Sequence, residues 1–198
     1  MADFFDVVRR QRAYRELLPD PVPESLIENL LEAATYAPSA ENSQPWVFVV
    51  VRDAELRARI GAIVREAWEG FAREISRPNL SERFFAAVDR WATGGLAAAP
   101  VIIVVCVDAS LTHEVTLPSS VFPATQNLLL AAQALGLGSL LSTLPVVVGP
   151  QLGELLALPA HIQPMAALPI GWPARKLGPP RRISFREKSF RDRYGERW

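Results

Sequence analysis

The sequence predicts an α+β fold in which helices cover a mixed central sheet. Segments with apolar residues at helical spacing alternate irregularly with short apolar strands along the 198 residues, which does not suit a regular doubly wound sheet. Residues 100–107 (PVIIVVCV) are mostly β-branched and show no alternation, as in a central strand covered on both faces. The chain is 49% hydrophobic and 21% charged, so we expect residues 1–198 to form one domain with a sizeable core.

The first half of the chain is predicted to contain helices at 4–11, 24–37 and 54–74, a strand at 46–51, and a fourth helix or irregular lid at 80–95. Prolines set several boundaries, because proline fixes φ and restricts the residue before it. Three prolines at 19–23 impose an extended linker, and Pro38 ends the second helix. Asp53 is a good N-cap for the third helix.

The second half is predicted to contain a strand at 100–107, a helix at 124–135, a strand at 139–144, a short helix at 151–156 and a strand at 165–171. Pro123 opens the long helix and Gly136 ends it. From about residue 175 we expect a basic arm, because 175–198 hold nine basic and three acidic residues, a net charge of +6. The arm lacks aromatic platforms with the glycine spacing of nucleic-acid-binding tails, so a solvated arm, or one that wraps a partner subunit, is favoured.

Charge and hydropathy bound the partners of the chain. Lys+Arg and Asp+Glu both total 21, so net charge gives no reason to expect a nucleic acid or an anionic membrane. Residues 115–153 carry no charged side chain, and 127–148 is long enough to cross a bilayer. Polar residues and glycines interrupt this stretch, however, and no basic cluster flanks it. We therefore expect no membrane span, but a helix and a strand buried on all sides, in part by a second subunit.

Several other classes of protein are disfavoured. The N-terminus lacks the apolar core of a signal peptide, and the single Cys106 cannot form an internal disulfide, so a cytoplasmic protein is expected. His113 and His161 have no cysteine or acid at ligand spacing, so we expect no metal site. No Gly-x-Ser-x-Gly elbow, Walker loop or Rossmann glycine fingerprint occurs, and no side chain stands out as a catalytic group.

Two pairs of arginines and one loop could bind a ligand. Arg12 and Arg15 are three residues apart, so we expect them close together at the end of the first helix, where two guanidinium groups could hold a phosphate. Arg181 and Arg182 could complete such a site, although both pairs also suit a solvated surface. The loop 37–46 (APSAENSQPW) is either a plain connector or a surface that offers hydroxyl, amide and backbone groups to a flat polar ligand.

A series of motifs in chain order resembles the FMN-dependent nitroreductase family. These motifs are RAYR at 12–15, PDPVP at 19–23, LLEAA at 30–34, APSAENSQPW at 37–46, APVIIV at 99–104, QNLLLAA at 126–132, LGLG at 135–138, IGWP at 170–173 and PRR at 180–182. Each motif alone is weak, but the ordered set spans nearly the whole chain.

The resemblance implies a homodimer in which both subunits build the FMN site. It assigns Arg12, Ala13 and Arg15 to the phosphate and pyrimidine edge; Pro38, Ser39 and Ala40 to the flavin ring, with the amides of Asn42 and Gln44 beside it; Ser142, Thr143 and Leu144 to the segment that faces N5; and Arg182, with Arg181 as a further candidate, to the phosphate. The flavin, rather than a side chain, would carry the redox chemistry.

The same resemblance implies a ping-pong oxidoreductase. NADH or NADPH would reduce FMN and leave, and a small electron-poor acceptor such as a nitroaromatic or a quinone would then be reduced. Alternatives on the same fold are reductive dehalogenation, flavin storage and flavin consumption; a membrane-associated or nucleic-acid-binding module is an alternative of another class. Gln11 and Ala13 stand where the family pattern has a basic residue and a serine, which puts one phosphate contact in doubt, and residues 74–95 match no motif that would identify the acceptor.

Overall fold

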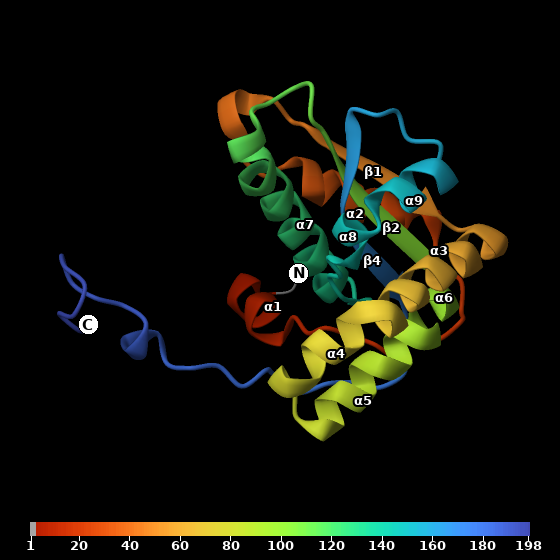
Figure 1. The fold of residues 1–198 in the computed structure, drawn as a ribbon. Helices are drawn as coiled ribbons and strands as arrows, with labels where there is room; N and C mark the ends of the chain where they lie inside the picture. The colour runs from red at the N-terminus through yellow and green to blue at the C-terminus, as the bar shows by residue number, and fades with distance from the viewer. Residues whose placement is uncertain (1–2) are drawn as a thin grey trace.

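The computed structural model describes residues 3–198 and has a four-stranded sheet with helices on both faces (Figure 1). The strands are β1 (Trp46–Val51), β2 (Val101–Asp108), β3 (Gly138–Ser139) and β4 (Ile162–Gly171), in the spatial order β1-β2-β4-β3. All three strand pairs are antiparallel. Within residues 3–198, parallel pairing is confined to an isolated bridge between Ala13 and Ser139. The predicted α+β class with a helix-covered sheet is confirmed, but the sheet is mixed only through this bridge.

The central strand β2 supplies both halves of the core. Val101, Ile103, Val105 and Val107 pack on one face with α2 (Glu24–Thr35) and α7 (Leu117–Ala134). Ile102, Val104 and Cys106 pack on the other face with α3 (Ala54–Ala67), α6 (Leu96–Ala98) and α9 (Gly149–Leu155). Because successive side chains of a strand point to opposite faces, a strand covered on both faces needs an unbroken apolar run, which β2 has, as predicted.

Residues 54–98 form two antiparallel helical segments, which we call the helical hairpin. The first segment is α3, a π-helical turn at Trp68–Ala72, α4 (Arg73–Ser76) and a 3₁₀ turn at Arg77–Asn79. The second segment is α5 (Glu82–Arg90), a π-helical turn at Trp91–Gly95 and α6. Each π-helical turn begins at a tryptophan, and such turns are frequent at functional sites. Figure 1 shows α4 and α5 side by side at one end of the molecule.

Several predicted boundaries are wrong: strand β4, for example, begins at Ile162 rather than at 165, and three other errors affect the site or the long helix. Helix α1 (Phe4–Arg10) ends before Arg12, so Arg12 and Arg15 do not share a helical turn. Helix α7 begins at Leu117, so Pro123 lies inside it rather than opening it. Proline has no N–H to donate to the carbonyl of Ser119 one turn earlier, but Ser119 is exposed, so water can reach that carbonyl. The strand predicted at 139–144 ends at Ser139, and α8 (Leu144–Val147) begins where that strand was expected to finish.

The uncharged stretch 115–153 is buried in part within the single chain. Eight residues of α7 are buried against the rest of the molecule, so burial inside one subunit accounts for much of the missing charge. Val146 and Val147 are nevertheless 50% and 57% exposed. Within residues 3–198 no helix is both long and apolar enough to cross a membrane.

The chain leaves the sheet along the N-terminal segment. Beyond β4, the backbone N–H of Ala174 donates to the carbonyl of Glu16 (3.1 Å), and Trp172 accepts from Leu18 (2.8 Å). The residues that follow, which we call the arm (residues 175–198), run away from the helix-covered sheet (Figure 1). The arm contains one 3₁₀ turn at Phe185–Glu187.

Candidate functional site

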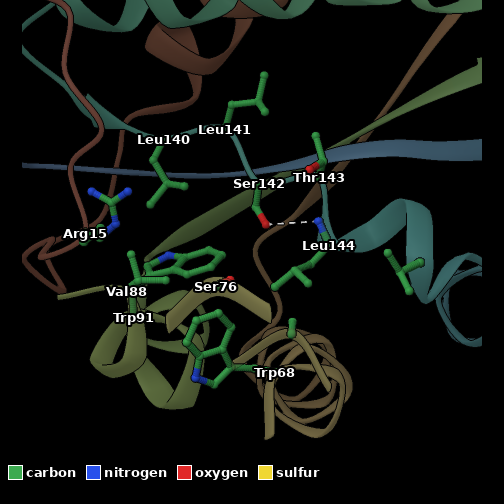
Figure 2. A pocket seen from close by; sticks show the side chains of 12 residues that line it. Arg15, Trp68, Ser76, Val88, Trp91, Leu140, Leu141, Ser142, Thr143 and Leu144 are labelled. Carbon is green, nitrogen blue, oxygen red and sulfur yellow. Dashed lines mark hydrogen bonds between the residues drawn. The ribbon is translucent and has the colours of Figure 1, made fainter. Parts of the chain in front are cut away.

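A cavity of about 320 Å³ lies between the helical hairpin and residues 140–147 (Figure 2). Trp68, Val88 and Trp91 from the hairpin form one wall. The opposite wall comes from Leu140 to Leu144, and the side chain of Arg15 lies at one end. The structure thus brings together two of the segments that the sequence assigned to a flavin site, Arg15 and residues 142–144.

Backbone hydrogen bonds to β4 fix the wall that contains Ser142. Ser142 is buried and exchanges two backbone bonds with Ala167, at 3.1 Å and 2.9 Å. Its hydroxyl accepts from the backbone N–H of Leu144 (3.4 Å) at the start of α8. Thr143 is exposed between these two anchors, so its side chain is available to a ligand.

The N-terminal segment places Arg15 against the hairpin. Its backbone is fixed by the Ala13–Ser139 bridge and by the Tyr14 N–H, which donates to Ser139 (2.9 Å). The Arg15 guanidinium stacks on the ring of Phe84, 4.7 Å from the ring centroid. A Cβ atom at Gly95 would lie 3.2 Å from the Arg15 carbonyl oxygen, so glycine permits this close approach of the hairpin.

Arg12 and Arg15 form a local concentration of positive charge. Burial, and after it the nearby charge of Arg12, lower the pKa of the Arg15 guanidinium. Within residues 3–198 neither arginine forms a salt bridge; Glu16, the residue after Arg15, pairs instead with Arg90 and Arg175, each at 3.5 Å. Arg12 Nη1 donates to the carbonyl of Gly178 in the arm (2.5 Å). The pair therefore keeps N–H donors free for an anion.

The loop 37–46 has an unusual backbone. Glu41, Asn42 and Gln44 have φ values of 54°, 55° and 48°, in the left-handed region that non-glycine residues rarely adopt. The Ser39 hydroxyl accepts from the Gln44 N–H (3.0 Å), and the Ala40 N–H donates to Ser120 Oγ (3.1 Å). Strained backbone of this kind persists where its surroundings fix it, and it is concentrated at functional sites.

The same loop is remote from the cavity within one chain. The loop contacts Ser120, which is in the first turn of α7. Ser139, which pairs with Ala13 and accepts from the Tyr14 N–H, follows the other end of that helix. Helix α7 has 18 residues and is about 27 Å long. Figure 1 shows the loop and α1 at opposite ends of α7. Pro38, Ser39, Ala40, Asn42 and Gln44 therefore do not meet Arg12, Arg15 or Ser142 in a single subunit.

The two arginines in the arm are also apart from the cavity. Arg181 and Arg182 are exposed, and Arg182 Nη1 donates to the carbonyl of Arg181 (3.2 Å). Arg181 is three positions beyond Gly178, which Arg12 contacts, so the chain can carry Arg181 no more than about 11 Å from that point.

The tryptophans of the cavity were missed by sequence reasoning. Trp68 Nε1 donates to Asp89 (2.9 Å), which also accepts from Arg73 Nε (3.0 Å). Asp89, in the second helical segment of the hairpin, thus fixes the indole of the first segment. The indole N–H of Trp91, by contrast, is buried without a hydrogen-bond partner among residues 3–198. The signal was one tryptophan in each of two consecutive helices, but nothing in the sequence shows that both face one cavity.

The helix-covered antiparallel sheet, and a cavity with a cationic side chain at one end, define an α+β protein with a candidate ligand site. A model of the nitroreductase family matches residues 8–172, which is most of the chain. The chain belongs to the nitroreductase family.

Sequence relatives fall into two groups. A candidate NADH dehydrogenase/NAD(P)H nitroreductase from Methanothermobacter thermautotrophicus is 30% identical over 188 residues, covering 89% of this chain and 80% of that protein. Iodotyrosine deiodinase 1 from Rattus norvegicus is 30% identical over 181 residues, which are 87% of this chain but 63% of the deiodinase. The chain thus spans less than two thirds of the rat deiodinase.

A solved structure with a similar fold holds both a flavin and a second ligand. Iodotyrosine deiodinase bound to FMN and 3-iodo-L-tyrosine has a TM-score of 0.77 at 25% identity, covering 98% of this chain and 99% of that one. A Bacteroides thetaiotaomicron protein of the family, with a TM-score of 0.77 at 24% identity and coverage of 98% and 100%, shares the fold.

Proposed function

We propose that this chain is an FMN-dependent oxidoreductase that takes electrons from NADH or NADPH and passes them, in a ping-pong cycle, to a small electron-poor acceptor such as a nitroaromatic or a quinone. The observation that carries the proposal is Arg15, which lines one end of a cavity in a nitroreductase-family chain and has the charge of Arg12 nearby. Neither guanidinium has a carboxylate partner among residues 3–198. A charge-assisted donor set of this kind fits the phosphate of FMN.

The side chains present fit the rest of the cofactor as well. When bound, FMN would supply hydride acceptance and electron transfer at its ring. Arg15, which lines the cavity, would supply hydrogen-bond donors that stabilise negative charge on a bound ring, and residues 142–144 would hold one of its edges. The strained loop would supply amides from Asn42 and Gln44.

We infer that a functional site needs two copies of this chain. The loop 37–46 and the cavity lie at opposite ends of α7 in one subunit, so the residues that the family resemblance assigns to one flavin can meet only across a subunit interface. A homodimer with twofold symmetry would build two such sites. The half-exposed, uncharged residues Phe122 and Leu130 on α7 suit an interface of this kind.

Reductive dehalogenation is the second candidate, and the iodotyrosine deiodinase relatives favour it. Arg15 is the charged side chain that lines the cavity in this chain. Such a cavity suits a neutral or anionic aromatic acceptor, for example a halogenated phenol, better than it suits an amino acid with an ammonium group.

The test is a two-stage anaerobic experiment. Protein loaded with FMN is titrated with NADH or NADPH while the flavin absorbance is followed, and the reduced protein is then mixed with a nitroaromatic, a quinone, a 2-iodophenol and 3-iodo-L-tyrosine. We expect bleaching by a reduced nicotinamide and rapid reoxidation by the first two acceptors. Reoxidation by the iodinated compounds alone would favour dehalogenation, and failure to bind FMN would refute both functions.

A further inference from the structure

Both walls of the cavity beside Arg15 are uncharged. The hairpin wall consists of two indoles and three smaller side chains, from Trp68, Ala72, Ser76, Val88 and Trp91. The opposite wall consists of aliphatic and hydroxyl side chains, and Figure 2 shows its residues Leu140 to Leu144 across the cavity from the two indoles. Among residues 3–198, the charged side chains that line this cavity are limited to Arg15, at one end.

The ionised groups behind the hairpin wall are compensated within the hairpin. One oxygen of Asp89 accepts from both Trp68 Nε1 (2.9 Å) and Arg73 Nε (3.0 Å). Arg77, one turn further along the chain from Arg73, pairs with Glu82 (3.8 Å). The carboxylate of Asp89 is thus used to hold the wall together, and it is not among the groups that face the cavity.

The indole of Trp68 is fixed at its edge and on its face. Asp89 holds the N–H, and the ring of Phe85 packs against the indole with centroids 6.0 Å apart and planes 38° apart. Trp68 is only 3% exposed, so the indole cannot turn away without breaking these contacts. A fixed aromatic side chain is a preformed surface for a planar ring, because little conformational entropy is lost when the ring binds.

The charge of the cavity decides which rings it suits. Under the proposed function Arg15 serves the flavin, which leaves the acceptor with uncharged lining groups among the described residues. A charged substituent on the acceptor would lose its water there and gain no counter-charge, which costs free energy. An uncharged ring would instead bury apolar area against the indole and the aliphatic wall.

We propose that this cavity selects uncharged aromatic acceptors, with Trp68 as a specificity-determining residue and Asp89 as the residue that positions it. The inference rests on the proposed function, because it takes bound FMN and electron transfer to an acceptor as given. It adds an order of preference: neutral rings first, anionic rings second because Arg15 is the nearest charge, and cationic rings last.

A series of acceptors with one reacting group and three charges tests the order. 4-Nitrobenzyl alcohol is neutral at pH 7, 4-nitrobenzoate is anionic and 4-nitrobenzylamine is cationic. Each is titrated into the oxidised FMN-loaded protein, where no reaction occurs, and its dissociation constant is read from the change in flavin absorbance. The photoreduced protein is then reoxidised by each compound without oxygen, and the rate constant is divided by that for free reduced FMN to remove differences in intrinsic reactivity.

We expect the neutral compound to bind at least about tenfold more tightly than either charged one, and to have the largest normalised rate constant. Anionic or cationic compounds that bind as tightly as the neutral one would overturn the inference, while the proposed function would stand as long as the flavin is bound and reoxidised. Failure to bind FMN, or to pass electrons to any of the three, would overturn the proposed function and the inference with it.

Two variants test Trp68 and Asp89 separately from stability. Trp68→Phe loses the bond to Asp89 and should weaken binding of the neutral compound about 3- to 10-fold, with FMN affinity nearly unchanged. Trp172→Phe is the matched control, because it also loses an indole hydrogen bond, to the Pro21 carbonyl (3.3 Å), away from the cavity. Asp89→Ala should weaken binding as Trp68→Phe does, and Asp89→Asn should restore it, since the amide oxygen still accepts from Trp68.

A purely structural role gives a different pattern. Acceptor binding would then follow the melting temperatures of the variants, and Asp89→Asn, which loses the charge pair with Arg73, would weaken it as well. That result, or equal acceptor binding by Trp68→Phe and the unmodified protein, would overturn the roles given to the two residues. The charge series on the unmodified protein and Trp68→Phe decide the inference even if Asp89→Ala does not fold.

Discussion

Arg15 is distinguished from the other arginines of the chain by its surroundings: burial and a neighbouring arginine lower the pKa of its guanidinium. Arg52, Arg73, Arg77, Arg90 and Arg175 each have a carboxylate within salt-bridge distance. Arg15 has an aromatic ring and another arginine as neighbours, and burial lowers its pKa. Placing like charges together without a counter-charge costs free energy, which an anionic ligand recovers on binding.

The first prediction concerns Arg12. Arg12→Ala removes a guanidinium and should weaken FMN binding by about 1.5–3 kcal/mol, roughly 10- to 150-fold, because a charged hydrogen bond to the phosphate is lost. Arg182→Ala should weaken it in the same direction. A fluorescence titration measures both dissociation constants, with Arg9→Ala as the control. Unchanged constants in both variants would remove these arginines from the site.

Asn42 allows a second test, on the opposite side of the proposed site. Its φ of 55° suits glycine, so Asn42→Gly removes the amide without straining the backbone. The turn is closed by the Asn42 N–H, which donates to the Ser39 carbonyl (3.1 Å), and glycine keeps this bond. We expect the melting temperature of the flavin-free protein to change little, while the stabilisation conferred by FMN falls. An equal fall with and without FMN would make the loop a connector only.

At the scale of elements, Asp89 joins the two helical segments of the hairpin. The hydrogen bond from Trp68, and after it the one from Arg73, lower the pKa of the Asp89 carboxyl below its ordinary value of 3.8. A carboxyl whose pKa is lowered by folding stabilises the protein above its ordinary pKa. This stabilisation is lost as the pH falls through the folded-state value.

Asp89→Asn should therefore change how stability depends on pH. At pH 7 we expect a loss of about 1–2 kcal/mol, because the amide still accepts from Trp68 but no longer attracts Arg73. Below the ordinary pKa the difference from the unmodified protein should shrink, because the carboxyl is then protonated. Melting temperatures between pH 2.5 and 7 measure this, with Glu82→Gln in the same hairpin as the control. A difference that stays constant across this range would contradict the assignment.

The sequence predicted the elements whose signals are local. Strand β1 matches its predicted bounds, and the apolar run 100–107 was correctly placed at the centre of the sheet. Prediction from the sequence failed where tertiary contacts decide whether a segment is helix, strand or loop. Pro123 reads as a helix start, yet packing of Leu117, Val121 and their neighbours extends α7 past it. Residues 140–144 read as a strand, but Ser142 makes a single bridge to β4 before α8 begins.

The site was predictable only in part, for a similar reason. The family motifs pointed to Arg15 and residues 142–144, which do share a cavity. The cavity wall that contains Trp68 and Trp91 depends on how two helical segments face each other. The Arg12–Gly178 contact joins residues 166 positions apart. No single-sequence pattern encodes either arrangement.

At the scale of the whole molecule, the separation of the loop 37–46 from the cavity makes a prediction about assembly. A variant with defects at the arginine end (Arg12→Ala) and a variant with defects in the loop (Asn42→Gly with Gln44→Gly) should each form dimers whose two sites are both weakened. In a mixed dimer, one site collects both defects, and the other is built from the intact arginine end of one chain and the intact loop of its partner. Mixing the two variants should therefore restore one tight FMN site per dimer. We would purify the mixed dimers through two different tags, confirm their mass by light scattering, and count tight sites by FMN titration at concentrations where neither parent binds. If both halves of a site came from the same chain, every site in the mixed dimer would stay defective, so a count of zero tight FMN sites would overturn the two-subunit site. A monomeric mass for the unmodified protein with FMN bound tightly would overturn it as well.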